Sequence, residues 1–64
     1  RFYVRSRREG AERTEWVGSG TLRACQELVQ QVPSGEVAEL VRRLDEAVMV
    51  RCWRDQYGLQ RIEF

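Results

Sequence analysis

The sequence contains no histidine and no lysine, a single proline and only two cysteines among its 64 residues. Without histidine, a serine or cysteine nucleophile lacks its most common general base, and no other base stands out beside the serines or the cysteines. Carboxylates are paired only as sequence neighbours, such as Asp45 with Glu46 and Glu36 with Glu39, which is typical of a solvated helix surface. We therefore expect no enzymatic activity and no catalytic residue, metal or cofactor.

The two cysteines, Cys25 and Cys52, are too few for a zinc site and do not have the CxxC spacing of a redox motif. Each falls on the apolar side of its predicted element. We interpret both as buried free thiols, with a disulfide between them in the core as the alternative.

No apolar run approaches the ~20 residues that a membrane-spanning helix requires, and no signal-peptide pattern is found. We therefore expect a cytoplasmic protein without a membrane partner. Hydrophobic residues make up 42% and charged residues 33% of the chain, which is the composition of one globular domain over residues 1–64. The first residue is Arg1 rather than methionine, which leaves open whether a larger protein contains this chain.

All 11 basic residues are arginines, and 10 acidic residues bring the net charge to +1. This near balance argues against a dedicated nucleic-acid binder, which is usually strongly basic. Arginine has a planar group that suits carboxylates, phosphates and aromatic faces, so an arginine-rich surface favours a role in contacts.

Apolar and polar residues alternate over residues 2–8, and β-favouring residues return over 13–17 after a polar turn at 9–12. This predicts an N-terminal hairpin. Residues 48–54 and 59–64, joined by a turn at 55–58, predict a second hairpin. The turn register leaves the orientation of Trp16 open.

Between the hairpins, apolar residues recur at spacings of three and four, which predicts two amphipathic helices. Thr21 is a suitable N-cap for the first helix, whose stripe runs from Leu22 to Val32. The second is expected to begin after Ser34, and its stripe consists of Val37, Leu40, Val41, Leu44, Ala47 and Val48. We expect Leu44 to be buried at the centre of that stripe.

The order ββααββ predicts an α+β fold with a four-stranded, largely antiparallel sheet and both helices packed on one face. In that arrangement seven residues face the helices: Phe2, Val4, Val48, Val50, Cys52, Ile62 and Phe64. Seven others face away from them and form the candidate partner-binding surface: Tyr3, Arg5, Arg7, Met49, Arg51, Trp53 and Arg61.

A face with Tyr, Trp, Met and several Arg has the composition of an interaction hot spot. We therefore predict a small non-enzymatic protein-binding module that occludes the surface of a macromolecular partner. Bacterial and phage regulators or inhibitors, such as antirestriction and anti-CRISPR proteins, are comparable with this chain in size alone.

Binding of RNA or single-stranded nucleic acid is one alternative, with Tyr3 and Trp53 stacking bases. Self-association, as a homodimer formed through sheet faces or edges, is another.

Overall fold

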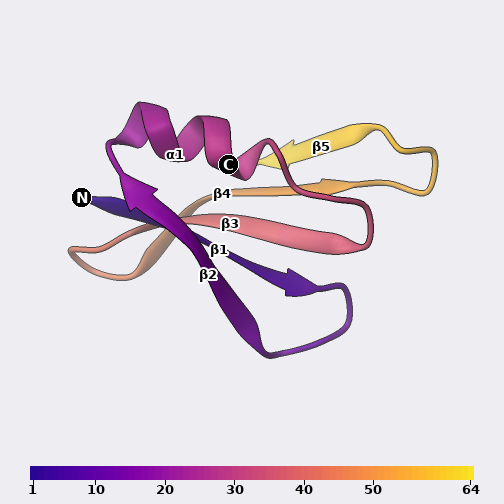
Figure 1. The fold of residues 1–64 in the computed structure, drawn as a ribbon, viewed down its shortest axis with the longest axis horizontal. Helices are drawn as coiled ribbons and strands as arrows, with labels where there is room; N and C mark the ends of the chain where they lie inside the picture. The colour runs from indigo at the N-terminus through magenta and orange to yellow at the C-terminus, as the bar shows by residue number, and fades with distance from the viewer.

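The computed structural model describes all 64 residues and consists of one antiparallel sheet and one short helix (Figure 1). The elements are β1 (Phe2–Arg8), β2 (Thr14–Gly20), α1 (Leu22–Val29), β3 (Glu36–Arg42), β4 (Ala47–Arg54) and β5 (Gln60–Glu63). The strand order is β2-β1-β3-β4-β5, so that β3 is the central strand and returns beside β1 after the excursion through β2 and α1.

The predicted ββααββ arrangement is wrong, because residues 36–42 form the central strand β3 and not a second helix. Five consecutive residues of β3, from Val37 to Val41, are buried, so both faces of the strand are covered. A strand buried on both faces loses the alternation of apolar and polar residues that identifies a strand. Its apolar residues then fit the helical spacing equally well.

The residues expected to continue the second helix instead form the turn between β3 and β4. Asp45 stabilises this turn: its carboxylate accepts a hydrogen bond from the Ala47 N–H and pairs with Arg42 at 2.7 Å. Glu46 has a positive φ of 58°, which a helix does not allow. Leu44 is 88% exposed, so the prediction that it is buried is also wrong.

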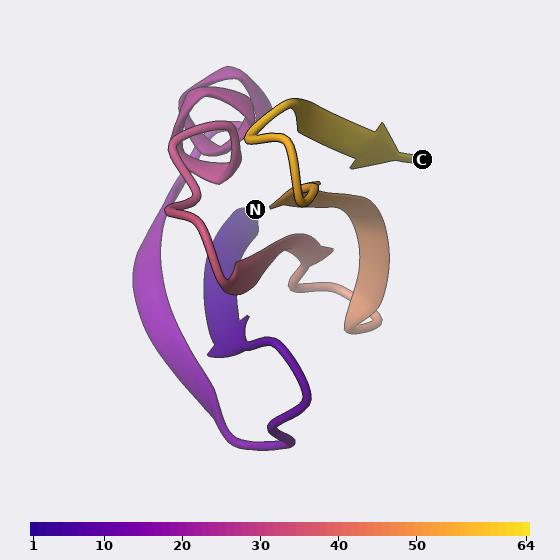
Figure 2. The same ribbon diagram turned by 90° about the vertical axis from the view of Figure 1, so that its right-hand side faces the viewer.

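The core lies between α1 and the sheet, which curves beneath the helix from β2 to β5 (Figure 2). It consists of Val4, Ala38, Leu40, Val50 and Cys52 from the sheet, with Cys25, Val29 and Val32 from α1 and the turn after it. The helix begins as predicted after Thr21, whose Oγ1 accepts a hydrogen bond from the Ala24 N–H. Gly18 permits the close approach of α1 to β2, since a Cβ there would lie 2.9 Å from Cδ1 of Leu28.

Three residues expected to face the helices do not contribute to this core. A β-bulge in the β3–β4 ladder shifts the register, so that Val48 pairs with Val41 on the opposite face. Ile62 and Phe64 are 43% and 92% exposed, because α1 packs on β1 to β4 and leaves β5 largely uncovered.

Both cysteines are free and fully buried in the core, which confirms the interpretation of free thiols. Burial raises the pKa of both the Cys25 and the Cys52 thiol. The helix α1 has eight residues, and the chain contains no helix with the length and apolar composition to cross a membrane.

We predict that Leu40→Ala lowers the free energy of unfolding by about 2 to 5 kcal/mol, because Leu40 is fully buried in the central strand. Leu44→Ala is the matched control and should change it by less than about 0.5 kcal/mol, because Leu44 is solvated. Urea denaturation of the two variants measures both values. A large loss for Leu44→Ala would support the helix that the sequence predicted and contradict this fold.

Candidate partner-binding face

The face of the sheet opposite α1, called here the outer face, is built from three rows of residues that cross the strands. The first row contains Tyr3, Val41 and Val48; the second Trp16, Arg5, Glu39, Arg51 and Glu63; the third Thr14, Arg7, Val37, Trp53 and Arg61. Directly opposed residues of neighbouring strands point to the same face. The registers therefore place six of the seven predicted residues together on the outer face.

Met49, the seventh predicted residue, does not belong to this face. It lies at the bulge between β3 and β4 and packs against the core cluster, partly buried. Simple alternation along β4 therefore gave the wrong position for Met49 and for its neighbour Val48, whereas it gave the right one for Arg51 and Trp53.

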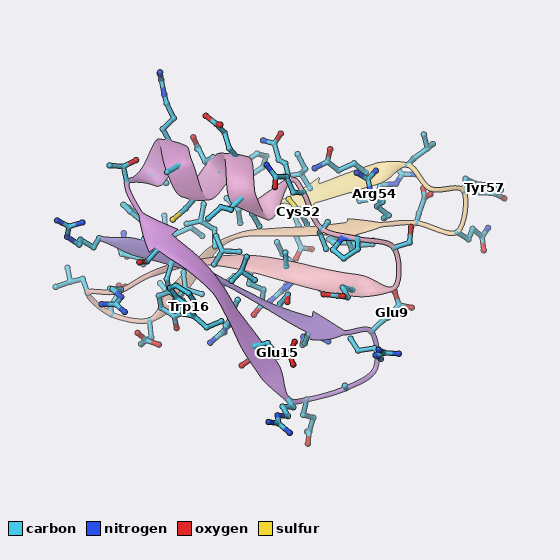
Figure 3. The ribbon with its side chains drawn as sticks, viewed as in Figure 1. Glu9, Glu15, Trp16, Cys52, Arg54 and Tyr57 are labelled. Carbon is cyan, nitrogen blue, oxygen red and sulfur yellow. The ribbon has the colours of Figure 1, made fainter.

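Trp16 is a member of the outer face whose orientation the sequence left open. It lies on β2 directly opposite Arg5, and 66% of the residue is exposed (Figure 3). The register shifts between Val4 and Arg5, because β2 contains a bulge at this point. No pattern in residues 13–17 indicates this bulge.

Glu39 is the only buried charged residue, at 5% exposure, and it organises the second row. Its Oε1 accepts a hydrogen bond from Arg5 Nε and its Oε2 accepts one from Arg51 Nε, each at 2.9 Å. Arg51 also donates through Nη1 to Glu63 at 2.8 Å. The network thus joins the four neighbouring strands β1, β3, β4 and β5 through side chains of alternating charge.

Burial of the Glu39 carboxylate raises its pKa, but the hydrogen bonds and charges of Arg5 and Arg51 outweigh this effect, and the pKa lies below its ordinary value. The hydrogen bonds to Glu39 raise the pKa of both arginines in turn. The two hydrogen bonds of 2.9 Å to the Glu39 carboxylate hold both guanidinium groups beside it.

Tyr3 forms one border of the outer face with the turn between β3 and β4. Its hydroxyl donates a hydrogen bond to Glu46 at 2.8 Å, which raises the pKa of Tyr3. The guanidinium carbon of Arg43 lies 5.7 Å from the centre of the Tyr3 ring, which is a cation–π contact.

The arginines of the outer face differ in how far their charge is neutralised. Arg5 and Arg51 share Glu39, and Arg61 pairs with Asp55 at 3.0 Å. Arg7 has no carboxylate within 4.0 Å and donates one long hydrogen bond, of 3.5 Å, to the Ala11 carbonyl. Most of the positive charge on this face is therefore balanced within the molecule.

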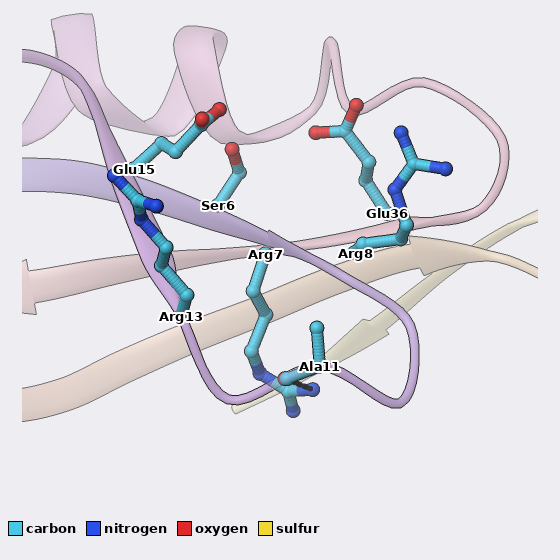
Figure 4. Close-up of a pocket in the computed structure, with 7 residues that line it drawn as sticks. All are labelled: Ser6, Arg7, Arg8, Ala11, Arg13, Glu15 and Glu36. Carbon is cyan, nitrogen blue, oxygen red and sulfur yellow. Dashed lines mark hydrogen bonds between the residues drawn. The ribbon is translucent and has the colours of Figure 1, made fainter.

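A hollow of about 230 Å³ lies beside the turn between β1 and β2. It is lined by Ser6, Arg7, Arg8, Ala11, Arg13, Glu15 and Glu36 (Figure 4). Ser6 and Arg7 extend to opposite sides of β1. Its arginines are mixed with glutamates, which gives no concentrated charge for an anion.

No three His, Cys, Asp or Glu side chains come together as a metal site requires. The chain matches no protein-family model, no curated protein and no solved structure to a significant degree.

We predict that Glu39→Gln lowers the free energy of unfolding at pH 7 by about 1 to 3 kcal/mol, because two charge-assisted hydrogen bonds are weakened at partly exposed arginines. In the wild type the folded-state pKa of Glu39 is depressed, so its contribution is complete above the ordinary pKa of 4.5. The contribution is lost as the pH falls through the folded-state pKa.

Urea denaturation at a series of pH values should therefore show a steeper loss of stability below pH 4.5 in the wild type than in Glu39→Gln. Asp45, whose pKa the hydrogen bond from Arg42 lowers to about 2, titrates in both proteins and does not account for a difference. Parallel curves would mean that the Glu39 pairs do not form in solution.

Proposed function

We propose that this chain is a non-enzymatic protein-binding module that contacts a protein partner through the outer face. The observation that carries the proposal is Trp16, a large aromatic side chain 66% exposed at the end of a row of fixed charges. Tyr3, Trp53 and the arginines lie on the same face. Trp, Tyr and Arg are the residues that dominate binding hot spots.

The ion network gives the outer face a second property of a binding surface, which is preorganisation. Arg5 and Arg51 are already held by Glu39, so a partner that stacks on them or accepts their remaining N–H groups orders little that was free before. A surface fixed in advance reduces the entropy lost on association.

Charge supports a protein partner over a nucleic acid. Of the four arginines on this face, Arg5, Arg51 and Arg61 are paired with carboxylates, and only Arg7 is not. A phosphate bound through the remaining N–H groups of the paired arginines would lie close to the Glu39, Glu63 and Asp55 carboxylates and would be repelled by them. The net charge of +1 adds no long-range attraction for nucleic acid.

Within this proposal, the module acts by occupying a partner surface, as small bacterial and phage regulators and inhibitors of larger machines do. The support for that class is the size of the chain and an exposed face whose side chains suit contact. A nucleic-acid partner is the alternative that the experiment below must separate.

We predict that Trp16→Ala weakens binding to the partner by about 30-fold or more, the usual consequence of truncating a hot-spot tryptophan. Tyr57→Ala is the matched control, because Tyr57 is 78% exposed at the turn between β4 and β5, away from the face (Figure 3). A photoreactive amino acid at position 14, which lies on the outer face and keeps Trp16 in place, or at position 57 first captures the partner from a lysate of the source cells, with and without nuclease. Titration of the purified partner then measures the affinities.

The expected result is capture from position 14 and not from position 57. Excess wild type should compete with this capture, and excess Trp16→Ala should not. A captured species that nuclease destroys would contradict a protein partner. Equal affinities of Trp16→Ala and Tyr57→Ala, with circular dichroism showing both folded, would place the binding surface elsewhere.

A further inference from the structure

The strand β5 is an open edge of the sheet and presents both backbone and apolar groups to solvent. All four of its residues, Gln60 to Glu63, are exposed, and Ile62 is 43% exposed. It pairs with Arg51 to Arg54 of β4 on one side and with no strand on the other. Edge strands of this kind are templates for pairing with another chain.

The hydrogen bonds of the β4–β5 turn show which backbone groups point to the open side. The Leu59 carbonyl accepts a hydrogen bond from the Asp55 N–H across the hairpin. Successive residues of an antiparallel strand direct their backbone groups to opposite sides. Arg61 and Glu63 therefore bond to β4, whereas the N–H and C=O groups of Gln60 and Ile62 point outward.

The sequence of β5 is self-complementary when two copies pair antiparallel about Ile62. In that register Ile62 opposes Ile62 of the second copy, and Gln60 opposes Phe64. Arg61 lies opposite Glu63 of the second copy, and Glu63 lies opposite its Arg61. The two Arg61–Glu63 pairs occupy non-hydrogen-bonded positions, at which the opposed side chains are closest.

We propose that a second copy of this chain binds at the β5 edge by antiparallel strand pairing centred on Ile62, with two reciprocal Arg61–Glu63 pairs on the outer face. Both side chains are available for such pairs, since those of Arg61 and Glu63 are 59% and 58% exposed in spite of their internal partners. The proposal does not rest on the proposed function of the outer face.

The other edge of the sheet, β2, is less suited to a second copy. It contains a β-bulge and two glycines, Gly18 and Gly20. Bulges and glycines interrupt the regular ladder that strand addition needs. Pairing through β5 joins two five-stranded sheets into one continuous sheet and brings the two outer faces side by side.

The contact is limited to one short strand per copy, far below the about 20 to 30 residues of a standard interface. We therefore expect a weak dimer, with a dissociation constant of about 0.1 to 1 mM. Sedimentation equilibrium of the full chain up to about 2 mM should show a dimer that dissociates on dilution.

Charge reversal tests the register. Arg61→Glu and Glu63→Arg each turn two attractive pairs into two repulsive ones, and each should weaken self-association by about tenfold or more. An equimolar mixture of the two variants again opposes unlike charges at both positions and should associate about as strongly as the wild type. Arg23→Glu, an exposed reversal on α1 without an ion-pair partner, is the control and should leave self-association unchanged.

Hydrogen exchange on the wild type tests the strand pairing without a variant, so its result does not depend on whether the variants fold. The Ile62 N–H should be protected at high concentration and lose its protection on dilution, whereas the Arg61 N–H, bonded to β4, should stay protected throughout. A monomer at about 2 mM, a dimer that Arg61→Glu and Glu63→Arg both leave intact, or an Ile62 N–H that exchanges equally fast at all concentrations would each overturn the proposal.

Discussion

The double ion pair of Glu39 is the interaction on which the sheet depends. A carboxylate in the central strand, 5% exposed, would be strongly destabilising without compensating partners. Arg5 of β1 and Arg51 of β4 provide one hydrogen bond to each carboxylate oxygen. The same contacts fix the register of β3 against both neighbours, because a slip by one residue would turn Glu39 toward the apolar core beneath α1. A non-local pairing between β1 and β3 is thus specified by charge as well as by burial.

The burial of Glu39 and its neighbours in β3 also explains why the sequence predicted the strands of the two terminal hairpins and missed the central strand β3. The strands β1 and β4 keep the alternation of half-buried strands over most of their length, so period two identified them. In β3 the outward positions are Val37, Glu39 and Val41, all buried, and the only polar residue among five is one that helices also favour. What distinguishes a central strand from a helix is its partners, and those lie far away in the sequence.

The candidate site was predictable to the extent that it follows from alternation. Arg5, Arg7, Arg51 and Trp53 share the outer face because their strands are regular there. The orientations of Trp16 and Met49 depend on β-bulges, which shift the register by one residue and which no pattern in the sequence indicates. Glu39 was assigned to a solvated helix surface, so its position between two arginines could not be anticipated. The predicted set of arginines was therefore right in position but incomplete in its chemistry.

The ion network changes what the outer face can be used for. Only 12 of the 64 residues are buried, so the apolar core is small and the arginines on the outer face take part in holding the sheet together. A ligand that competed for Arg5 or Arg51 would withdraw partners from Glu39 and weaken the fold that presents it. Recognition is compatible with stability where it uses groups that the network leaves free, namely the exposed Trp16 ring, the unpaired Arg7 and the open faces of the fixed guanidinium groups. A polyanion at those positions would lie close to the carboxylates of the network and would be repelled by them, whereas uncharged apolar and carbonyl groups would not.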